Sequence, residues 1–400
     1  MPHVTLRRAA IALALFFPAG IAWAAGPASL PHQAYVWQRA WTPQVGTALE
    51  QTADLFAGYR VLVAEADAHG RLLQANINWA ALDRTRRPIT LVIRIDGQLR
   101  SGTSAAMVAR IGALASAWRG HRVTGLEIDH DCGTARLESY ARFLRDLRKV
   151  PGVPARLSIT ALPTWLTSPV FDKVAAAVDE LVLQVHAVQA PSAGLFDARS
   201  ARAWVNSLVR HRPKDFWIAV PDYGTRIVRA ENGSLLAVES EEPRLIGGVS
   251  ATELIATPVE VSAFIQDLQH APPPGLSGIV WFRLPVAGDR RMWSLSTLRN
   301  VIRGQPLSGR LDVVARPAGV AGVVNVVLTN ESDTDLPLPG AVELPAPCRL
   351  ADGVNGYALD GSGRNISLRR LQNALLPAHH EQVIGWARCS PAPGGFHVRP

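Results

Sequence analysis

Cysteine and lysine are both scarce in this 400-residue chain. Only three residues are cysteine, and the lysines are Lys149, Lys173 and Lys214, so arginine carries nearly all of the positive charge. The formal net charge is +8 at pH 7, which favours contact with acidic polymers or anionic surfaces. However, no basic run alternates with aromatic residues as a nucleic-acid surface requires, so we expect no nucleic-acid partner.

Several common catalytic motifs are also absent. The chain has no G-x-S-x-G elbow, H-E-x-x-H pair, glycine-rich phosphate loop or C-x-x-C pair. These absences argue against the common serine hydrolases, zinc peptidases, nucleotide-binding enzymes and thiol oxidoreductases. We therefore expect neither a cofactor nor a resident metal.

Long apolar runs are missing after residue 25. No later stretch reaches the ~18 uninterrupted apolar residues of a membrane-spanning helix. Before it, Arg7 and Arg8 precede an apolar segment at 9–21, and Ala22-Trp23-Ala24 forms a small-residue cleavage site. We predict a cleavable signal peptide at 1–25 and a periplasmic or secreted protein without stable membrane insertion.

If the protein is exported, its three cysteines are in an oxidising compartment. Cys348 and Cys389 lie together near the carboxyl end of the chain, and we expect them to form a disulfide. Cys132 directly follows an acidic segment, which leaves two interpretations open: a reactive thiol, or a buried and inert one at a strand-to-helix turn. The second interpretation is favoured.

Short apolar strands alternate with amphipathic helical segments over residues 33–304, which predicts an α/β fold with a (β/α)₈ TIM-type barrel. The predicted strands lie at 34–37, 59–65, 89–95, 123–129, 155–161, 180–185, 216–220 and 277–283. The predicted helices lie at 46–56, 104–118, 134–150, 169–178, 197–211, 258–270 and 293–303. Residues 72–78 could form a short extra strand.

Polar side chains alternate with apolar ones near the carboxyl end of five predicted strands. The pairs besides the acidic strand are Glu65 and Asp67, Arg94 and Asp96, Gln184 and His186, and Trp281 and Arg283. Barrel enzymes place their chemistry at the carboxyl ends of the strands. The pattern therefore predicts an active site at this end, with the polar residues facing inward.

The fourth predicted strand carries the segment GLEIDHD, residues 125–131. A strand repeats every two residues, so Glu127, Asp129 and Asp131 share one face, and their mutual repulsion raises the proton affinity of at least one. Three interpretations are open. The first is a metal site, although His130 has the wrong parity to join the acids; the second is a structural set that neutralises Arg94 and Arg283.

The third interpretation is a glycosidase-like site, which we favour. Asp131 would be the proton donor because it lies nearest the open end, Asp129 its partner carboxylate, and Glu127 a deeper residue that tunes their protonation. For each aromatic residue of this site, ordinary barrel core is an equally good explanation. The predicted substrate-binding residues are Trp37, Arg94, Asp96, Gln184, His186, Asp222, Tyr223, Trp281 and Arg283.

An unusually long segment, residues 222–257, follows the seventh predicted strand. Asn232-Gly233 lies between two alternating runs, which predicts a hairpin with a type I′ turn. Long loops in compact domains are usually functional, so we expect this hairpin to wall or cover the pocket.

The sequence pattern changes after Gly304. Residues 308–400 lack helical periodicity and contain short β-type runs separated by clusters of Pro, Gly, Asp and Ser. We predict a small β-sandwich that serves as an accessory domain. Its few aromatic residues make a sugar-binding module the less favoured alternative.

Three segments carry a family resemblance: GLEIDHDCGTARLESYARFLRDLR, LSITALPTW and DELVLQVHAV. They resemble the bacterial domain-of-unknown-function family 3142, over roughly residues 33–304. This resemblance implies a barrel of glycoside-hydrolase type and no particular activity. More distantly, Glu127, Asp129 and Asp131 are similar in spacing to the D-x-D-x-E signature of family 18 glycoside hydrolases.

The family 18 resemblance implies that the last acid donates a proton and the middle acid orients the acetamido group of the substrate. Here Asp131 stands where that family has glutamate, and Glu127 where it has aspartate. Two functions therefore stay open. One is an exported glycoside hydrolase that acts on an envelope or extracellular glycan; the other is an inactive barrel that binds glycans or envelope components.

Overall fold

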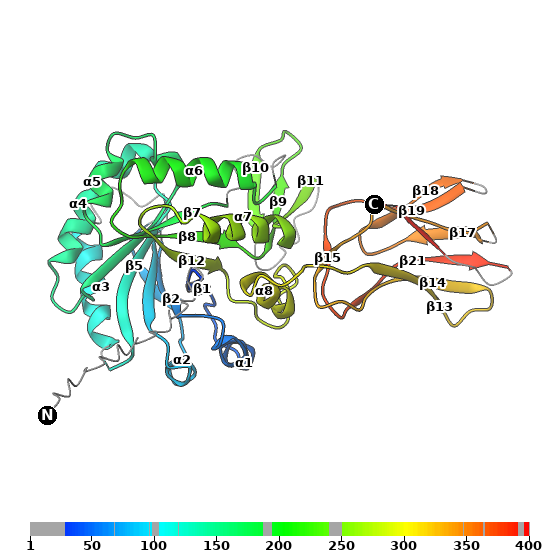
Figure 1. The fold of residues 1–400 in the computed structure, drawn as a ribbon, viewed down its shortest axis with the longest axis horizontal. Coiled ribbons are helices and arrows are strands. Elements are labelled where there is room, and N and C mark those ends of the chain that lie inside the picture. Colours follow the sequence, from blue (N-terminus) through cyan, green and yellow to red (C-terminus); the bar gives the residue numbers. More distant parts are fainter. Residues whose placement is uncertain are drawn as a thin grey trace, which may run out of the picture.

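The computed structural model describes residues 29–399 apart from 68, 96, 98–103, 119, 187–193, 240–249, 347, 363–364 and 391–395 (Figure 1). The predicted signal peptide and the predicted site residue Asp96 lie outside the described residues. No helix within the described ranges has the length and apolar character that crossing a membrane requires.

Eight parallel strands close into a barrel. Each strand pairs with the next around the ring, and β1 pairs with both β12 and β2, which closes it. The strands are β1 (His32–Val36), β2 (Gly58–Ala66), β4 (Ile89–Ile95), β5 (Val123–His130), β6 (Arg156–Ala161), β7 (Glu180–Gln184), β8 (Phe216–Pro221) and β12 (Leu276–Phe282). The predicted (β/α)₈ barrel is confirmed. The possible extra strand is β3 (Leu72–Gln74), which pairs antiparallel with β2 and does not change the barrel count.

Helices lie between the barrel strands and cover the outside of the barrel. They are α1 (Pro43–Thr52), α2 (Trp79–Thr85), α3 (Ser104–Ala117), α4 (Leu137–Arg148), α5 (Phe171–Ala175), α6 (Ala198–Arg210), α7 (Pro258–His270) and α8 (Leu295–Ile302). The predicted helix at 134–150 begins as a 3₁₀ turn at Thr134–Arg136 before α4. The sequence analysis missed α2, which has only seven residues and begins where the Asn78 side chain accepts a hydrogen bond from the Ala81 amide.

Strand β5 shows how the sequence produces the two layers of the core. Leu126 and Ile128 point outward and belong to the same buried cluster as the apolar face of α4. That face repeats every three or four residues, at Leu137, Tyr140, Ala141, Leu144 and Leu147. Inside the barrel, a separate cluster contains Tyr35, Trp37, Leu62, Val92, Val182, Trp217, Ala219 and Val280. The barrel is therefore filled by side chains on both faces of its sheet.

A three-stranded antiparallel ribbon follows β8. It consists of β9 (Gly224–Arg229), β10 (Leu235–Glu239) and β11 (Ser250–Ile255), in the order β10-β9-β11. The predicted hairpin at Asn232-Gly233 is confirmed, but the predicted type I′ turn is wrong. Gly233 has a positive φ of 80°, whereas Asn232 does not have one, and the Gly233 amide bonds the Ala230 carbonyl at 2.8 Å. The connection is thus a longer turn in which only glycine takes the left-handed conformation.

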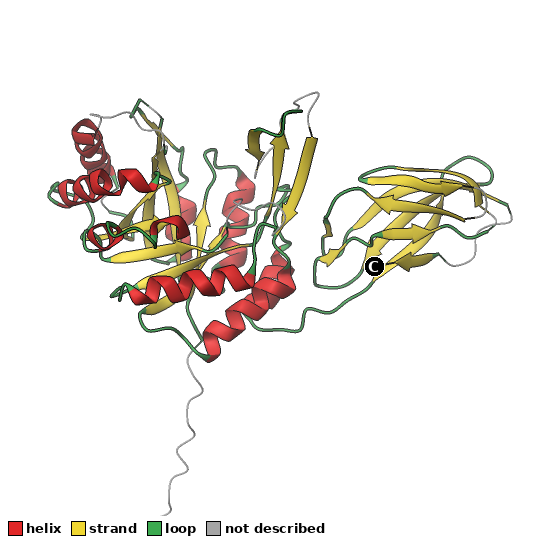
Figure 2. Ribbon diagram, turned by 90° about the horizontal axis from the view of Figure 1, so that it is seen from above, coloured by secondary structure: helices red, strands yellow, loops and turns green. Residues whose placement is uncertain are grey.

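The C-terminal region is all-β, as predicted (Figure 2). One sheet has the order β13-β14-β21-β17 and another β18-β19-β16-β22, both four-stranded and antiparallel, with a short β15-β20 ladder beside them. The strands are β13 (Leu311–Pro317), β14 (Val323–Asn330), β15 (Leu336–Pro337), β16 (Ala341–Glu343), β17 (Cys348–Gly353), β18 (Tyr357–Ser362), β19 (Asn365–Arg370), β20 (Leu375–Leu376), β21 (Glu381–Cys389) and β22 (His397–Arg399). The predicted disulfide between Cys348 and Cys389 is confirmed and joins β17 to β21.

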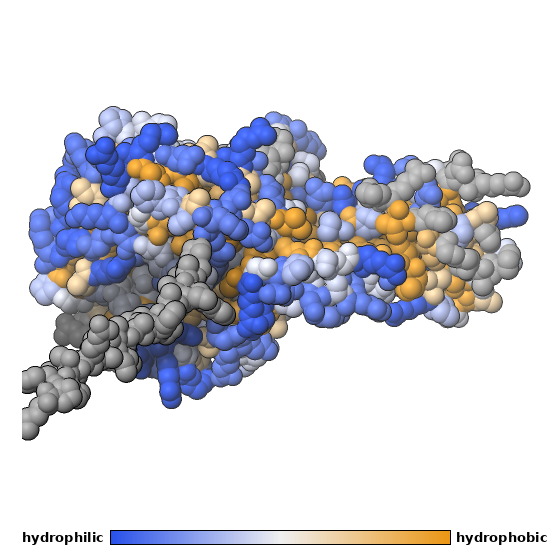
Figure 3. All heavy atoms as spheres, viewed as in Figure 1, coloured by the Kyte–Doolittle hydropathy of each residue, from blue (hydrophilic) through white to orange (hydrophobic). Residues whose placement is uncertain are grey.

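The C-terminal sheets contact the barrel at the start of α8. Asp335 accepts hydrogen bonds from the Ser294 amide at 2.7 Å and the Ser294 hydroxyl at 2.6 Å, and its own amide donates to the Thr297 hydroxyl at 2.7 Å. Leu375 packs against the barrel core. Figure 3 shows apolar residues gathered where the two regions meet. A carboxylate cap and an apolar contact therefore hold the two regions together.

Candidate active site

The acids of β5 divide between the interior and the open end of the barrel. Glu127 is fully buried, Asp129 is 3% exposed, and Asp131 follows the last strand residue with a side chain that is 41% exposed. His130 points the other way, where its Nδ1 donates to the Ile95 carbonyl at 3.1 Å and its ring contacts Tyr140. The predicted parity of this strand is therefore confirmed.

Glu127 lies in a closed network deep in the barrel. It accepts hydrogen bonds from the Tyr35 hydroxyl at 2.6 Å and the Ser158 hydroxyl at 3.2 Å, and it forms an ion pair with Arg60. Arg60 also pairs with Glu180 at 2.6 Å. Desolvation raises the pKa of Glu127, against the opposing effect of the Arg60 charge. Because every member of this network is buried, bulk water does not reach Glu127.

The buried network extends toward the other end of the barrel through Glu180. This carboxylate accepts from the Trp217 indole at 2.9 Å and from Arg156 at 2.6 Å. Arg156 in turn contacts Asp215, which accepts from the Ser277 hydroxyl. The structural interpretation of the acids thus describes Glu127, although its partner is Arg60 and not the expected Arg94 or Arg283.

Asp129 and Asp131 form a looser cluster at the mouth of the barrel. The Thr160 hydroxyl donates to Asp129 at 2.6 Å, so the carboxylate is held from β6. Arg94 lies between the two acids, with Nη1 3.8 Å from Asp129 Oδ2 and Nη2 3.8 Å from Asp131 Oδ2. Its guanidinium carbon stands 5.8 Å from the ring centre of Trp37. At these distances Arg94 attracts both acids without binding either one tightly.

The pKa of Asp131 is raised into the range that suits acid catalysis. Desolvation and the negative charge of Asp129 raise the pKa of Asp131 to about 7, while Arg94 acts in the opposite direction. A carboxyl group with this pKa is protonated at mildly acidic pH and can still release its proton near neutrality. Asp131 therefore has the protonation equilibrium of a general acid.

A small pocket opens above Asp129. Its volume is about 10 Å³, which is room for roughly one water molecule. Four predicted site residues line it, namely Trp37, Asp129, Gln184 and His186, whereas Arg94, Asp131 and Tyr223 are not in its lining. The complete lining is Tyr35, Trp37, Asp129, Thr160, Gln184, His186, Ala219 and Phe282. No strand residue of the β9–β11 ribbon is in this lining, so the described part of the ribbon does not wall the pocket as expected.

His186 is an uncharged wall residue at neutral pH. Burial lowers its pKa to about 4, and Nδ1 lies 3.3 Å from the Ala219 carbonyl. Its ring stacks on Phe282 at 5.8 Å and meets the edge of Tyr223 at 5.9 Å. Tyr223 therefore packs against a wall residue of the pocket, although it is itself buried and is not in the lining.

The inward orientation expected for Trp281 is wrong. Trp281 is fully buried in the outer core, where its indole nitrogen donates to His32 Nδ1 at 3.0 Å and its ring contacts Trp293. Its neighbour Phe282 faces the pocket instead. The polar indole N–H of Trp281 suggested an inward position, but this group forms its hydrogen bond between the sheet and the helices.

Arg283 and Asp222 lie away from the acids of β5. Arg283 is 2% exposed and forms an ion pair with Asp289, in the loop after β12, instead of the expected contact with the acids. Asp222 is fully buried, and no side chain in the described part of the chain forms a hydrogen bond with its carboxylate. Desolvation raises its pKa well above the ordinary value, against the attraction of Arg283. Neither residue is in the lining of the pocket above Asp129.

Two other interpretations can be compared with the structure. Within the described ranges, no group of three or more His, Cys, Asp or Glu residues is arranged to hold a metal ion. Cys132 is buried, and desolvation raises the pKa of its thiol to about 11, which agrees with the inert interpretation.

The sequence analysis missed five residues that shape the interior: Tyr35, Arg60, Thr160, Glu180 and Phe282. Arg60 offered a usable signal, because it is the only basic residue in the mostly apolar segment GYRVLVAEA and has the inward parity of Leu62. The other four look like ordinary strand residues. Only the closure of the barrel brings them next to the acids.

Comparison with known proteins gives two family matches. Residues 85–287 match the model of DUF3142, a domain of unknown function, and residues 313–390 match DUF8456, another domain of unknown function. A search of curated proteins found no match.

Several solved structures are similar to the chain. A chitinase from Chromobacterium violaceum ATCC 12472 has 13% identity and a TM-score of 0.48, over 69% of this chain and 98% of that one. The spore cortex-lytic enzyme SleL of Bacillus cereus has 15% identity and a TM-score of 0.49, over 70% of this chain and 75% of that one. The chitinase RmChi1 of Rhizomucor miehei has 16% identity and a TM-score of 0.47, over 68% and 99%. At these identities and TM-scores, no activity or substrate follows for this chain.

Proposed function

This chain belongs to the DUF3142 family of domains of unknown function, and from the chemistry of its barrel mouth we propose that it is an exported glycoside hydrolase. The observation that carries the proposal is the pair Asp129 and Asp131. One carboxylate is held by Thr160, and the other is partly exposed with a pKa raised to about 7. Two neighbouring carboxyl groups with different environments are the chemical requirement for cleaving a glycosidic bond.

In the proposed reaction, Asp131 is the general acid. Its carboxyl proton passes to the oxygen of the glycosidic bond while the bond from that oxygen to the anomeric carbon breaks, so the leaving sugar departs as an alcohol. The Asp129 carboxylate stabilises the positive charge that develops on the anomeric carbon. Water finally supplies the hydroxyl group to that carbon and a proton to Asp131, which balances the hydrolysis.

Arg94 and the aromatic wall complete this assignment. Arg94 keeps the two acids from repelling each other fully, since it lies 3.8 Å from both. Trp37 and Phe282 offer apolar surface beside Asp129, and sugar rings commonly pack on such surface. The substrate class we propose is an envelope or extracellular glycan, consistent with a chain of net charge +8 that begins with a signal-like segment.

Export is part of the proposal. It rests on the residues Arg7 and Arg8, the apolar segment 9–21 and the Ala22-Trp23-Ala24 site. Expression of the full chain in a Gram-negative host, followed by fractionation and N-terminal sequencing, is expected to give a periplasmic protein that begins near Ala25. Retention of Met1 on a cytoplasmic product would contradict it.

A second candidate is a barrel that binds glycans without cleaving them. Two observations favour it: the pocket above Asp129 has a volume of only about 10 Å³, and the donor position holds the shorter aspartate. This candidate predicts saccharide binding in calorimetry without any turnover.

The deciding experiment is a turnover screen. Purified protein would be incubated with chitin-type, peptidoglycan and exopolysaccharide substrates, and new reducing ends would be measured for the parent and for Asp131→Asn. We expect turnover of at least one glycan, with a loss of about a hundredfold or more in the variant. Asp146→Asn is the matched control, because Asp146 is 59% exposed on α4 and forms an ion pair with the neighbouring Lys149 on the outside of the barrel. Full turnover of every responsive glycan by Asp131→Asn would exclude the proposed mechanism.

A further inference from the structure

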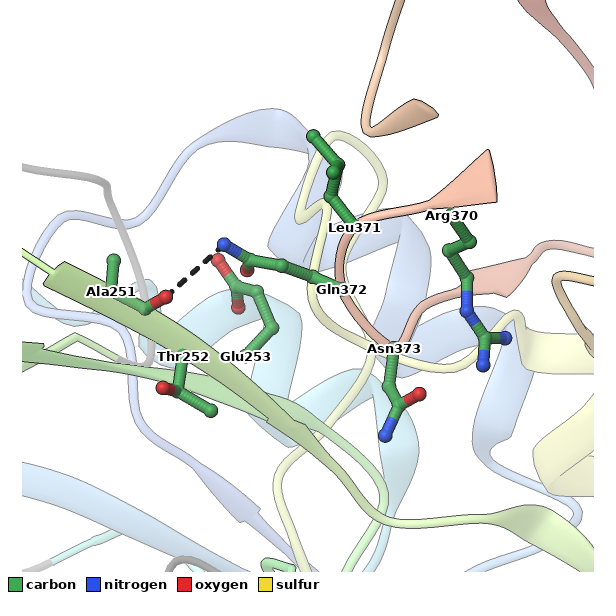
Figure 4. A pocket seen from close by; sticks show the side chains of 7 residues that line it. All are labelled: Ala251, Thr252, Glu253, Arg370, Leu371, Gln372 and Asn373. Atoms are coloured by element: carbon green, nitrogen blue, oxygen red, sulfur yellow. Dashed lines mark hydrogen bonds between the residues drawn. The ribbon is translucent and has the colours of Figure 1, made fainter. Parts of the chain in front are cut away.

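A cleft of about 330 Å³ lies between the β9–β11 ribbon and the C-terminal region (Figure 4). One side is formed by Ala251, Thr252 and Glu253 of β11. The other side is formed by Arg370, Gln372 and Asn373, which end β19 and begin the following turn. This cleft is far larger than the pocket above Asp129 and shares no lining residue with it.

The strand on the barrel side presents its backbone to this cleft. β11 is an edge strand, since the ribbon has the order β10-β9-β11. The Gln372 amide nitrogen donates to the Ala251 carbonyl at 3.1 Å, so this carbonyl points away from β9. Alternate residues of a strand direct their backbone groups to the same side, which places the backbone groups of Glu253 at the same edge. The edge therefore offers hydrogen-bonding groups in addition to its side chains.

The side chains of the cleft are almost all polar. Asn373 brings an amide donor and acceptor, and Thr252 brings a hydroxyl group. Arg370 brings a guanidinium whose Nη1 already donates to the Leu338 carbonyl, and Glu253 brings a carboxylate that Arg291 holds at 3.1 Å. In Figure 4 the side chains of Arg370 and Asn373 extend toward the same space, and Leu371 points away. A ligand here would need many hydroxyl groups that both donate and accept. It would not need an apolar body.

We propose that this cleft is a second saccharide-binding site, which holds part of the same glycan on which the proposed function depends. Its volume is at the lower end of the range for small-ligand sites, ~300 to 1,000 Å³. Peptide binding by strand addition fits less well, because Gln372 already occupies the edge at Ala251 and the cleft has no apolar subsite for side chains. The lining contains no aromatic ring, so binding by the cleft is weak and serves to retain a long substrate.

The cleft is connected to the mouth of the barrel through Arg291. Its side chain holds Glu253, and its carbonyl accepts from the Gly224 amide at 2.7 Å, next to Tyr223. Gly224 pairs with Ile255, so Glu253 lies two residues farther along the ribbon, at ~3.3 Å per residue. The proposed path of the glycan therefore runs from the barrel mouth along the ribbon to the cleft.

The test uses the full chain with Asp131→Asn, so that no probe is cleaved. Chitotetraose, cellotetraose, laminaritetraose and tetragalacturonate would be titrated by calorimetry and by saturation-transfer NMR. We expect at least one probe to bind, and the added pair Thr252→Ala and Asn373→Ala to weaken that binding by about tenfold or more, as loss of two hydrogen bonds requires. Both residues are exposed, so the folded state is retained.

Asn206→Ala is the matched control, since Asn206 is an exposed asparagine on α6 outside the cleft. Binding that is equal in the double variant and the control would overturn the cleft site and leave the proposed hydrolase untouched. Binding of none of the four probes would overturn it as well. If the double variant loses binding while the parent chain cleaves no glycan, the result would support the cleft site and contradict the proposed hydrolase.

Discussion

The barrel holds two charged regions that differ in their relation to water. Around Glu127, the side chains of Arg60 and Glu127 are 1% and 0% exposed, and each carboxylate has short, direct partners. Around Asp131, the side chains of Arg94 and Asp131 are both 41% exposed, and the ion-pair distances are 3.8 Å. Both regions include acids from the same strand, only four residues apart along the chain.

The comparison separates structural acids from chemically available ones. A buried ion pair with complete hydrogen bonding excludes water and substrate, and removing one partner leaves a charge without compensation. A loose cluster at the open end can exchange its partners and its protons. We therefore assign Glu127 to stability and Asp129 with Asp131 to chemistry, and the following experiments test this division.

The largest expected effect is on stability, from Arg60→Met. This change leaves Glu127 buried without its counter-charge and removes one partner of Glu180, so we expect a loss of about 3–5 kcal/mol of unfolding free energy. Urea denaturation followed by circular dichroism would measure it.

Arg94→Met is the matched control for Arg60→Met. Its side chain is 41% exposed, so we expect a change below about 1 kcal/mol. Equal losses of unfolding free energy in the two variants would show that the charges around Glu127 and around Asp131 contribute equally to stability.

The second effect is on turnover, from Asp129→Asn. Loss of the negative charge removes stabilisation of the anomeric carbon, and we expect turnover to fall by about a hundredfold with little change in stability. The same change removes one cause of the raised pKa of Asp131, so this pKa moves down from about 7. Carboxyl-carbon NMR would follow Asp131 in both proteins. An unchanged pKa would show that Asp129 does not act on Asp131.

The third effect is a pH dependence. Asp131 must be protonated to donate, so turnover is present below pH 7 and falls by about tenfold per unit above it. Because the pKa of Asp131 is raised in the folded state, ionising this residue destabilises the fold. This destabilisation is absent below pH 3.8, the ordinary pKa, and complete above about pH 7. Asp131→Asn is therefore expected to gain stability relative to the parent as pH rises through this window. Parallel stability curves for the two proteins would contradict the raised pKa.

The smallest effect is expected from Thr160→Val. This substitution removes the hydroxyl group that donates to Asp129 at 2.6 Å, at a cost of about 1 kcal/mol in stability and about fivefold in turnover. Thr124→Val is the control, because Thr124 lies at the other end of the barrel, where its hydroxyl donates to the Ile89 carbonyl. If both changes reduce turnover equally, Thr160 does not position Asp129.

Local periodicity predicted the strands and most helices because each is encoded by neighbouring residues. The strand at 89–95 and the helix at 258–270 coincide with β4 and α7. Helix α2 escaped notice because seven residues carry too little periodic signal. Alternation on β5 also placed Glu127, Asp129 and Asp131 on one face correctly.

On β12 the alternation of polar and apolar residues predicted the wrong inward face, because alternation alone does not show which face of a strand lies inside the barrel. Val280 and Phe282 face the interior, while the more polar Trp281 faces the helices and bonds His32. Similarly, Arg283 lies past the end of the strand and turns to Asp289, a partner only six residues away in the chain. Polar character indicates the presence of a partner, not its direction.

The sequence by itself determined the number of barrel strands, the all-β character of the C-terminal region and the common face of the three acids, since these properties depend on the order of apolar and polar residues along short segments. Only the tertiary structure decided which acid is structural and which is available. Tyr35 and Arg60 lie 92 and 67 residues before Glu127 in the chain, and Thr160 is 31 residues from Asp129. The environment of a carboxylate is set by such distant neighbours, because burial and charge act through space and not along the chain.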